Sequence, residues 1–474
     1  MAACLRRVVS SFESPGSTHQ VSGGLTWRKA PASGLRPSVR FAVALVLTLG
    51  WVGFSVWVSA VWRGELEAAL GPVMAWVIPI FLAYIPGLII WFMIFTLLIT
   101  RYEELPLDPP KGDWAEGEWP SVTILVAAWN ESAGIVRTLE QIGALAYPGG
   151  LEVVVADNNS TDDTASLADA AGAHLPFPYR RVFEERQGKH NALNAALETV
   201  TTPLVVTVDA DTLLQEQALT RLVARVTRTP QGQHVCACAG ALVAANPLAT
   251  FITRMQQWDY RLGINGVKRM QAAYNTALVA QGAFSAYCTS DLRAVGGWPD
   301  AIGEDIVLTW TMLSARGLVQ YEPVALGFTV VPDKLSILLS QRSRWARGMF
   351  EGLRKNPPPT QPRILAKLVA GIDYLVPCLD IGVIFFWVPG VILFLFGYPL
   401  IFGWWSMLLL PITLTIFGFL ERWQARHVFR TLDIHPQHDR RGFIGYLFAY
   451  QVLTSAAALR GYGQYLAGAG RRWK

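Results

Sequence analysis

The chain has 474 residues and a formal net charge of +5; 52% of its residues are hydrophobic and only 16% are charged. This composition argues against an ordinary soluble protein and favours a membrane protein that carries a soluble domain. The positive charge is clustered beside apolar segments, and no aromatic-basic surface indicates nucleic-acid binding, so anionic lipid headgroups are the expected charged partner.

Two uncharged segments near the N-terminus predict membrane-spanning helices. They cover residues 41–62 and 68–100, and each exceeds the roughly 20 apolar residues that cross a bilayer. Residues 1–40 hold six Lys or Arg and one acid, whereas the loop 63–67 holds one Arg and two Glu. The positive-inside rule therefore places residues 1–40 in the cytoplasm and returns the chain there after the second span. A cleaved signal peptide is a weaker alternative because the segment 41–62 is too long.

The region between residues 120 and 320 alternates between predicted strands and helices. Apolar strands are expected at 121–128, 151–156 and 204–208, and helices at 133–146, 163–171 and 190–199. Such alternation predicts an α/β fold, in which a parallel sheet is wound on both faces by helices. Ligands of such sheets bind at the carboxyl ends of the strands.

Acidic side chains follow two of the predicted strands. Asp157 comes directly after the second strand, and Asp162 is expected to cap the next helix. Asp209 and Asp211 follow the third strand, and their i, i+2 spacing aims both carboxylates the same way in an extended chain. Hard oxygen ligands of this kind suit Mg²⁺ or Mn²⁺ bridging a diphosphate. An Asp-x-Asp pattern is common by itself, so the prediction of a metal site depends on the position of this pattern at the end of a strand.

The residues argue against two common motif classes. No Gly-x-Gly-x-x-Gly is present, and Gly188-Lys189 lacks the upstream glycine of a phosphate loop because position 183 is Phe. Cys236 and Cys238 would place both thiols on one face of a strand, but no second Cys or His pair completes a zinc site, so buried free thiols are expected. A nucleotide held through acids and a metal, without a glycine loop, favours a nucleotide sugar.

Two later motifs add candidate catalytic and binding residues. Glu304 and Asp305 open a predicted helix, either as acids favoured at a helix N-terminus or as the site of a general base. Gln341, Arg344 and Trp345, if helical, share one face because they are spaced i, i+3, i+4. An Arg side chain suits a diphosphate leaving group, and the indole of a Trp can stack on a sugar ring. The alternative is that this segment is a basic helix at the membrane interface, anchored by the Trp.

The C-terminal region predicts further spans. Residues 381–420 contain no charged side chain and are long enough for two crossings, with a turn near 397–403. The Arg-rich loop 421–442 is expected in the cytoplasm. A last segment, 443–459, is marginal in length. If it spans, the C-terminus lies outside, which conflicts with the basic residues at 471–474 and leaves the side of the C-terminus open.

Taken together, these residues resemble the membrane-embedded, processive β-glycosyltransferases of family 2, which include cellulose, chitin, hyaluronan and poly-N-acetylglucosamine synthases. The resemblance covers about residues 120–350, and its motifs occur in the expected order. They are Ala127-Ala128-Trp129-Asn130-Glu131, Asp157, Gly188-Lys189 with Asn194, Asp209 with Asp211, Gln281-Gly282-Ala283, Glu304-Asp305, and the group Gln341, Arg344 and Trp345. One departure is Asn158, where many relatives carry a second acid.

The resemblance implies a role for each matching position. Five residues would bind the nucleotide: Asn130, Glu131, Asp157, Lys189 and Asp209. Asp209 and Asp211 would hold Mg²⁺ or Mn²⁺. Asp305 would be the catalytic base, beside Glu304. Five residues would bind the acceptor and the diphosphate: Gln281, Gly282, Gln341, Arg344 and Trp345.

The resemblance also implies an organisation and an activity. A cytoplasmic GT-A-like domain (101–333) would lie between two N-terminal spans (41–100) and a C-terminal membrane region (364–474), with a cytoplasmic segment at 1–40 and an interface segment at 334–363. The implied reaction is inverting polymerisation of a UDP-sugar, with UDP-N-acetylglucosamine favoured, into an extracellular polysaccharide that passes through the membrane. Implied partners are the donor, the growing polysaccharide, the bilayer and an accessory membrane or secretion subunit, but no nucleic acid. A single transfer to a membrane lipid is the alternative, since ceramide glucosyltransferases carry a related motif.

Overall fold

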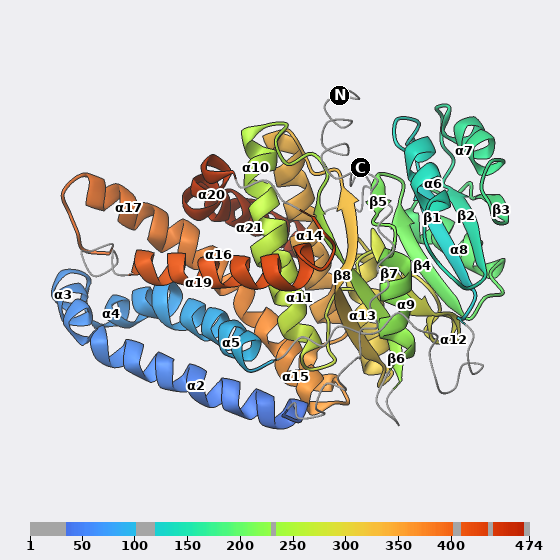
Figure 1. Ribbon diagram of the computed structural model, residues 1–474. Helices are drawn as coiled ribbons and strands as arrows, with labels where there is room; N and C mark the ends of the chain where they lie inside the picture. The colour runs from blue at the N-terminus through green and yellow to red at the C-terminus, as the bar shows by residue number, and fades with distance from the viewer. Residues whose placement is uncertain (1–34, 101–118, 229–233, 402–408, 435–438, 469–474) are drawn as a thin grey trace.

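The structure is a computed structural model that describes residues 35–100, 119–228, 234–401, 409–434 and 439–468. It has two parts, an α/β domain and a group of long apolar helices that extends from one side of that domain (Figure 1). The basic segments 1–34 and 471–474 and the predicted turn at Gly403 lie outside the described residues. The expectations about membrane sides that depend on them therefore stay predictions.

An eight-stranded sheet forms the centre of the α/β domain, in the order β3-β2-β1-β4-β7-β6-β8-β5. The strands are β1 (Val122–Ala128), β2 (Leu151–Asp157), β3 (Tyr179–Phe183), β4 (Leu204–Asp209), β5 (Thr212–Leu214), β6 (Val235–Ala244), β7 (Phe284–Cys288) and β8 (Leu318–Thr329). Strands β1 to β4 pair in parallel, which confirms the predicted first half of the sheet.

The prediction of an all-parallel sheet is wrong in the second half. Strand β7 runs antiparallel to both β4 and β6, and β5 runs antiparallel to β8, so the sheet is mixed. The reason is where β7 begins. The backbone N–H of Asp209, at the end of β4, donates to the carbonyl of Ala283. Because the chain enters β7 from the carboxyl end of β4, β7 must run back along it.

Helices cover both faces of the sheet, as predicted. One face packs against α6 (Ile135–Gly143), α7 (Thr164–Gly172) and α9 (Ala218–Thr227), and the other against α8 (Lys189–Glu198), α11 (Asn265–Ala272) and α13 (Glu304–Ser314). Alternate residues of each strand enter the two cores. In β1, Ile124 and Val126 belong to the first core and Leu125 to the second. Because such a strand is buried on both sides, its residues are apolar at successive positions, which gives the continuous apolar run in the sequence.

The two cysteines of β6 differ from the prediction. Cys236 and Cys238 are both buried and free, as expected, but their side chains join opposite cores. A register shift between Val235 and Ala237 marks a β-bulge at Cys236. The extra residue of a bulge turns a side chain to the other face, which the two-residue alternation does not foresee.

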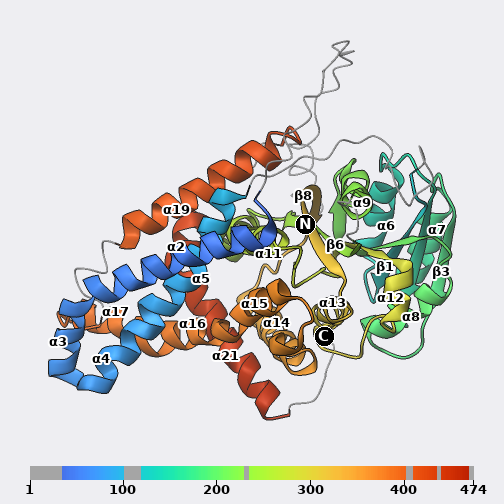
Figure 2. The same ribbon diagram turned by 90° about the horizontal axis from the view of Figure 1, so that it is seen from below.

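In the part of the chain that the structure describes, four helical stretches are long and apolar enough to cross a membrane, by length and composition. They are α2 (Pro37–Val58), α4 to α5 (Pro72–Ile99), α15 to α17 (Ile364–Leu395) and α20 to α21 (Arg440–Leu466). The first two overlap the two predicted N-terminal spans, and a further helix, α3 (Ala60–Leu70), separates them. Figure 2 shows α2, α4, α16 and α17 extending together away from the sheet.

The C-terminal helices differ in their limits from the prediction. The third stretch begins before the charge-free segment 381–420, and α19 (Leu409–Gln424), the expected second crossing, is not among the four. The last stretch extends the marginal segment 443–459 at both ends. It is tied to α16 (Val376–Gly382) because Ser455 and Tyr462 each donate a hydrogen bond of 2.7 Å to Asp380.

The helix α14 (Leu335–Lys355) joins the two parts of the molecule. It packs on α13 of the α/β domain and on α21 (Gln451–Leu466) of the apolar helices. Gly461 allows close approach, because an added Cβ there would lie 2.4 Å from the carbonyl oxygen of Ser343. The rings of Phe350 and Tyr462 extend the contact, with centroids 4.5 Å apart.

Candidate active site

A cavity of about 940 Å³ lies at the carboxyl ends of β1 and β4, bounded by the starts of β7 and α13 and by α11 and α14. Its lining brings together the predicted site residues that are scattered over more than 200 positions of the chain. These are Asn130, Glu131, Lys189, Asp209, Asp211, Gln281, Gly282, Glu304, Asp305, Gln341, Arg344 and Trp345. Within the described chain, the remaining predicted residue, Asp157, is not part of the lining.

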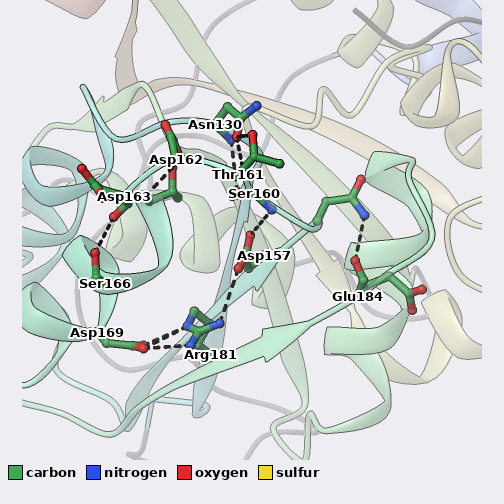
Figure 3. A network of polar contacts seen from close by, with 12 residues as sticks. Asn130, Asp157, Ser160, Thr161, Asp162, Asp163, Ser166, Asp169, Arg181 and Glu184 are labelled. Carbon is green, nitrogen blue, oxygen red and sulfur yellow. Dashed lines mark hydrogen bonds and ion pairs between the residues drawn. The ribbon is translucent and has the colours of Figure 1, made fainter.

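Asp157 instead belongs to a polar network that shapes the loops after β1 and β2 (Figure 3). Its side chain is buried, accepts a hydrogen bond from the backbone N–H of Ser160 at 3.1 Å, and pairs with Arg181 at 3.4 Å. Asn130 has a φ of 55°, in the left-handed region, and its side chain accepts from the backbone N–H of Thr161 at 2.8 Å. Asp157 therefore orders the loop beside the cavity.

Asp162 connects the same two loops through hydrogen bonds. The N-cap residue of α7 is Asp163, one position later than predicted, and its side chain makes no capping hydrogen bond. Asp162 accepts from the backbone N–H groups of Thr164 at 3.0 Å and of Ser132 at 3.2 Å. Burial raises the pKa of Asp162, but a hydrogen bond from the Thr164 hydroxyl, together with the hydrogen bonds from Ser132 and from the Thr164 backbone, outweighs burial and lowers the pKa to about 2. Its charge is thus used to join two loops.

The hydrogen bonds of Asn158 explain why this position holds an amide and not a second acid. Its side-chain nitrogen donates to the carbonyl of Arg186 at 2.7 Å, and its side-chain oxygen accepts from the backbone N–H of Gly188 at 2.7 Å. A carboxylate could accept but could not donate, so only an amide makes both bonds. Asn158 thereby holds the loop that precedes Lys189.

Acidic side chains crowd the end of β4. Asp209 forms an ion pair with Lys189, whose Nζ also lies 4.0 Å from Glu304. Burial raises the pKa of Asp211, and the charge of Asp209 raises it further. Burial raises the pKa of Glu131 to about 7, with Asp211 as the next contribution. A divalent cation would remove this repulsion, and the hard carboxylate oxygens fit Mg²⁺ or Mn²⁺.

The pair Glu304 and Asp305 lies in the first turn of α13, as predicted. Asp305 accepts hydrogen bonds from the backbone N–H groups of Gly282 at 3.4 Å and Ile306 at 2.8 Å. The pKa of Glu304 is raised by burial and then by the charge of Asp305. Two backbone N–H groups orient the Asp305 carboxylate at the cavity, where it could accept a proton from a substrate.

The motif on α14 is helical, as predicted, and its three predicted residues line the cavity: Gln341, Arg344 and Trp345. Sequence analysis missed Arg342, which lies over the Trp345 ring at 4.1 Å from its centroid. Arg342 is buried and donates hydrogen bonds to Asp259 at 2.9 Å and to the hydroxyl of Tyr450 at 2.7 Å. Because Tyr450 belongs to the last apolar helix, this contact links the indole to the membrane-type helices.

A further wall of the cavity comes from a segment that sequence analysis passed over. It comprises the π-helical turn 259–264, which follows α10 (Phe251–Trp258), and α11. It contributes Asp259, Tyr260, Asn265, Lys268 and Gln271 to the lining. A π-helical turn breaks the 3.6-residue period, so the apolar stripe that marks a core helix is hard to follow here. The signal that could have identified the wall is its set of polar side chains in an otherwise buried region.

Comparison with known proteins identifies relatives of this domain. Residues 120–348 match a family model described as "Glycosyltransferase like family 2". An N-acetylglucosaminyltransferase of Mesorhizobium japonicum is 31% identical over 272 residues, covering 54% of this chain and 61% of the relative. A poly-β-1,6-N-acetyl-D-glucosamine synthase of Staphylococcus aureus is 30% identical over 251 residues, covering 52% and 58%. The match thus spans little more than half the length of these relatives.

Among solved structures, the mannosyltransferase PcManGT from Pyrobaculum calidifontis, in complex with GDP-Man and Mn²⁺, matches with a TM-score of 0.55. It is 20% identical, and the match covers 86% of this chain and 100% of that chain. At this identity the likeness concerns the fold alone. The α/β domain has the GT-A-like glycosyltransferase fold, with a mixed sheet.

Proposed function

We propose that this chain, which carries a glycosyltransferase family 2 domain over residues 120–348, is an inverting, processive β-glycosyltransferase that polymerises a UDP-sugar. The observation that carries the proposal is one cavity lined by the acids of β4, the pair Glu304 and Asp305, and the α14 motif. UDP-N-acetylglucosamine is the proposed donor because the names of both relatives specify N-acetylglucosamine. The proposed product is an extracellular polysaccharide.

The proposed reaction is a single displacement. The carboxylate of Asp305 takes the proton of the acceptor hydroxyl while that oxygen attacks the anomeric carbon and the bond to the UDP oxygen breaks. Arg344 stabilises the negative charge on the departing diphosphate, and Trp345 stacks on the acceptor sugar. A divalent cation held by Asp209 and Asp211 would, when bound, neutralise the diphosphate. Attack from the face opposite UDP inverts the anomeric configuration.

The remaining predicted residues are proposed to act at two ends of the cavity. At the donor end, Asn130, Glu131 and Lys189 bind the nucleotide, and Asp157 acts on it by ordering the loop after β2. At the acceptor end, Gln281 and Gly282 line the path of the sugar. Gly282 suits close approach of a ligand or neighbour, since a Cβ there would lie 2.8 Å from the Lys189 Nζ.

The proposed site of action is the cytoplasmic face of a membrane. The four apolar helical stretches support membrane insertion, and the charge pattern of the flanking loops favours a cytoplasmic domain at 101–333. In this proposal α14 lies at the membrane surface, and the helices that follow residue 364 conduct the polymer outward. An accessory membrane or secretion subunit would act beyond them.

A donor panel tests this function. Purified full-length protein in detergent, with Mg²⁺ or Mn²⁺, is offered UDP-N-acetylglucosamine, UDP-glucose and UDP-glucuronate singly and in pairs, beside an Asp305→Asn control. High-molecular-weight product from UDP-N-acetylglucosamine alone is the expected result. A lipid-extractable product with one sugar would replace the polymerase by the lipid glycosyltransferase. No incorporation from any donor overturns both.

Gly348 provides a test of how α14 holds the catalytic turn. A Cβ added at Gly348 would lie 2.9 Å from the Cα of Gly303, the residue before Glu304. We expect Gly348→Ala to displace this turn, lowering stability by about 1–3 kcal/mol and turnover by up to about 100-fold. Thermal unfolding and initial rates of sugar incorporation measure the two effects. Gly463→Ala, where no atom lies within 4 Å of the new Cβ, is the matched control; equal behaviour of the two variants would contradict this role.

A further inference from the structure

Lys268 is a buried lysine whose ammonium group has no partner among the described residues. It lies on α11, is 8% exposed and lines the cavity. It makes no hydrogen bond or ion pair with any residue in the described ranges. The ammonium nitrogen is not among the fully enclosed unpartnered atoms of the described residues, so it opens into the cavity while the rest of the side chain is buried. Charges at such largely buried positions are normally paired. A lysine kept in this state calls for a ligand that supplies the missing hydrogen bonds.

The other polar side chains of α11 that line the cavity already form hydrogen bonds within the protein. The side-chain nitrogen of Asn265 donates to the carbonyl of Leu242 at 3.0 Å. The side-chain oxygen of Gln271 accepts from the backbone N–H of Leu278 at 3.0 Å. Both amides therefore have structural roles, whereas the Lys268 ammonium group remains available to the cavity.

Lys268 is associated with the acceptor side of the site. Lys189, the lysine of the donor side, is tied to Asp209. Burial lowers the pKa of Lys268 to about 7, and the nearby carboxylate that opposes this shift most is Asp305. Lys268 thus lies within electrostatic range of the proposed base without forming an ion pair with it. Lys268 and Asp305 line the same cavity, and an attacking hydroxyl must lie within hydrogen-bond reach of Asp305.

Two hydrogen-bond acceptors of the cavity are also unsatisfied. The side-chain oxygens of Gln281 and Gln341 are buried and have no partner among the residues that the structure describes. The nitrogen of the Gln281 amide is already bonded to the carbonyl of Gly240 at 2.6 Å, so the orientation of this amide is set. A ligand at this end must therefore both accept and donate hydrogen bonds, as the hydroxyl and acylamino groups of a sugar do.

We propose that Lys268 is a positioning residue for the acceptor: its ammonium group donates hydrogen bonds to oxygen atoms of the acceptor sugar and holds the attacking hydroxyl beside Asp305. The Gln281 side-chain oxygen accepts a hydrogen bond from the same sugar. This inference rests on the proposed function and adds a residue that recognises the hydroxyl oxygens of the acceptor. In this proposal Lys268 contacts the acceptor and not the donor, so it contributes to transfer and not to donor cleavage by water.

The test separates these two reactions in one assay. Purified full-length protein with Mn²⁺ and UDP-N-acetylglucosamine is given a soluble N-acetylglucosamine oligosaccharide, and transfer to this primer is measured beside hydrolysis of the donor. Lys268→Met is expected to raise the KM for the primer by about 10- to 100-fold, the value of a hydrogen bond from a charged group. Donor hydrolysis and UDP binding should stay within about twofold of wild type, since the donor contacts remain.

The variant should also fold well. Replacing an unpaired buried charge by an apolar side chain of similar length is neutral or stabilising, so the unfolding temperature of Lys268→Met should equal or exceed that of wild type. Lys268→Arg, which keeps hydrogen-bond donors, should recover part of the primer affinity. Lys334→Met, a change of an exposed lysine outside the cavity, is the matched control and should alter nothing.

The outcomes distinguish this inference from the proposed function. Wild-type transfer with an unchanged primer KM in Lys268→Met overturns the inference alone. A parallel loss of transfer, hydrolysis and UDP binding also overturns it, because Lys268 would then act on the donor or the fold. No transfer by the wild-type protein from any donor overturns the proposed function, and the inference with it.

Discussion

Asp305→Asn is expected to abolish sugar transfer while UDP-sugar still binds. An amide of the same shape cannot take the proton of the acceptor hydroxyl, and general-base catalysis contributes about 10²- to 10⁴-fold. The donor contacts at Lys189, Asp209 and Asp211 are untouched, so UDP affinity should change by no more than a few-fold, roughly the scatter of independent sites. Initial rates of polymer formation and titration of UDP in the presence of Mn²⁺ measure the two quantities.

Asp300→Asn is the matched control for this change. Asp300 lies in the loop before the same helix, and its side chain is 69% exposed, so its charge should not affect turnover. Substantial polymer formation by Asp305→Asn would remove Asp305 from the role of base. Loss of UDP binding in that variant would instead show that the substitution disturbs the donor side.

Asp211→Asn is expected to have the second-largest effect. Removing one carboxylate from the pair that would hold the cation should eliminate the Mn²⁺-dependent part of UDP binding and lower transfer by about 10²- to 10³-fold. The stability of the folded protein should not decrease. Burial and the charge of Asp209 raise the pKa of Asp211, so a neutral amide relieves repulsion and the unfolding temperature without metal should stay the same or rise.

Isothermal titration of UDP with and without Mn²⁺, together with a thermal melt, separates these effects. Chelation of the metal from the wild-type protein should reproduce the binding defect of Asp211→Asn. If UDP binds the variant as tightly as it binds wild type, and still responds to Mn²⁺, the cation is held elsewhere. Asp162→Asn, in a loop outside the cavity, tests whether loss of any nearby acid has the same consequence.

Much of the fold could be predicted because its signals are local. Strands β1, β2 and β4 are apolar runs that are buried on both sides, and the helices between them begin and end within three residues of the predicted limits. The direction of β7 carries no such signal, since a five-residue buried strand reads the same either way. Its direction follows from the contact between Ala283 and Asp209 at the end of β4.

The candidate site also contains some residues that could be predicted from the sequence and others that could not. Residues grouped in short motifs could be named as candidates from the sequence, because their chemistry is recognisable from side chains a few positions apart, and most of them line the cavity. Arg342 and Asp259 were missed because each is paired with a residue far away in the chain, and Lys268 was missed because only the packing shows that it is buried beside the cavity. Arg342 joins Asp259 and Tyr450 across 83 and 108 positions of the chain, and no spacing rule reports such a contact.

By itself, the sequence determined the family-type motifs, the apolar helices and the parallel half of the sheet, because hydrophobic period and motif chemistry are properties of neighbouring residues. Only the tertiary structure decided that Asp157 orders a loop, that the bulge at Cys236 separates the two thiols, and that α14 joins the turn before Glu304 to the last apolar helix. It also showed Lys268 buried without a partner within the described chain. These features arise when packing brings distant segments into contact, and burial then gives a charge or a hydrogen bond its energetic weight.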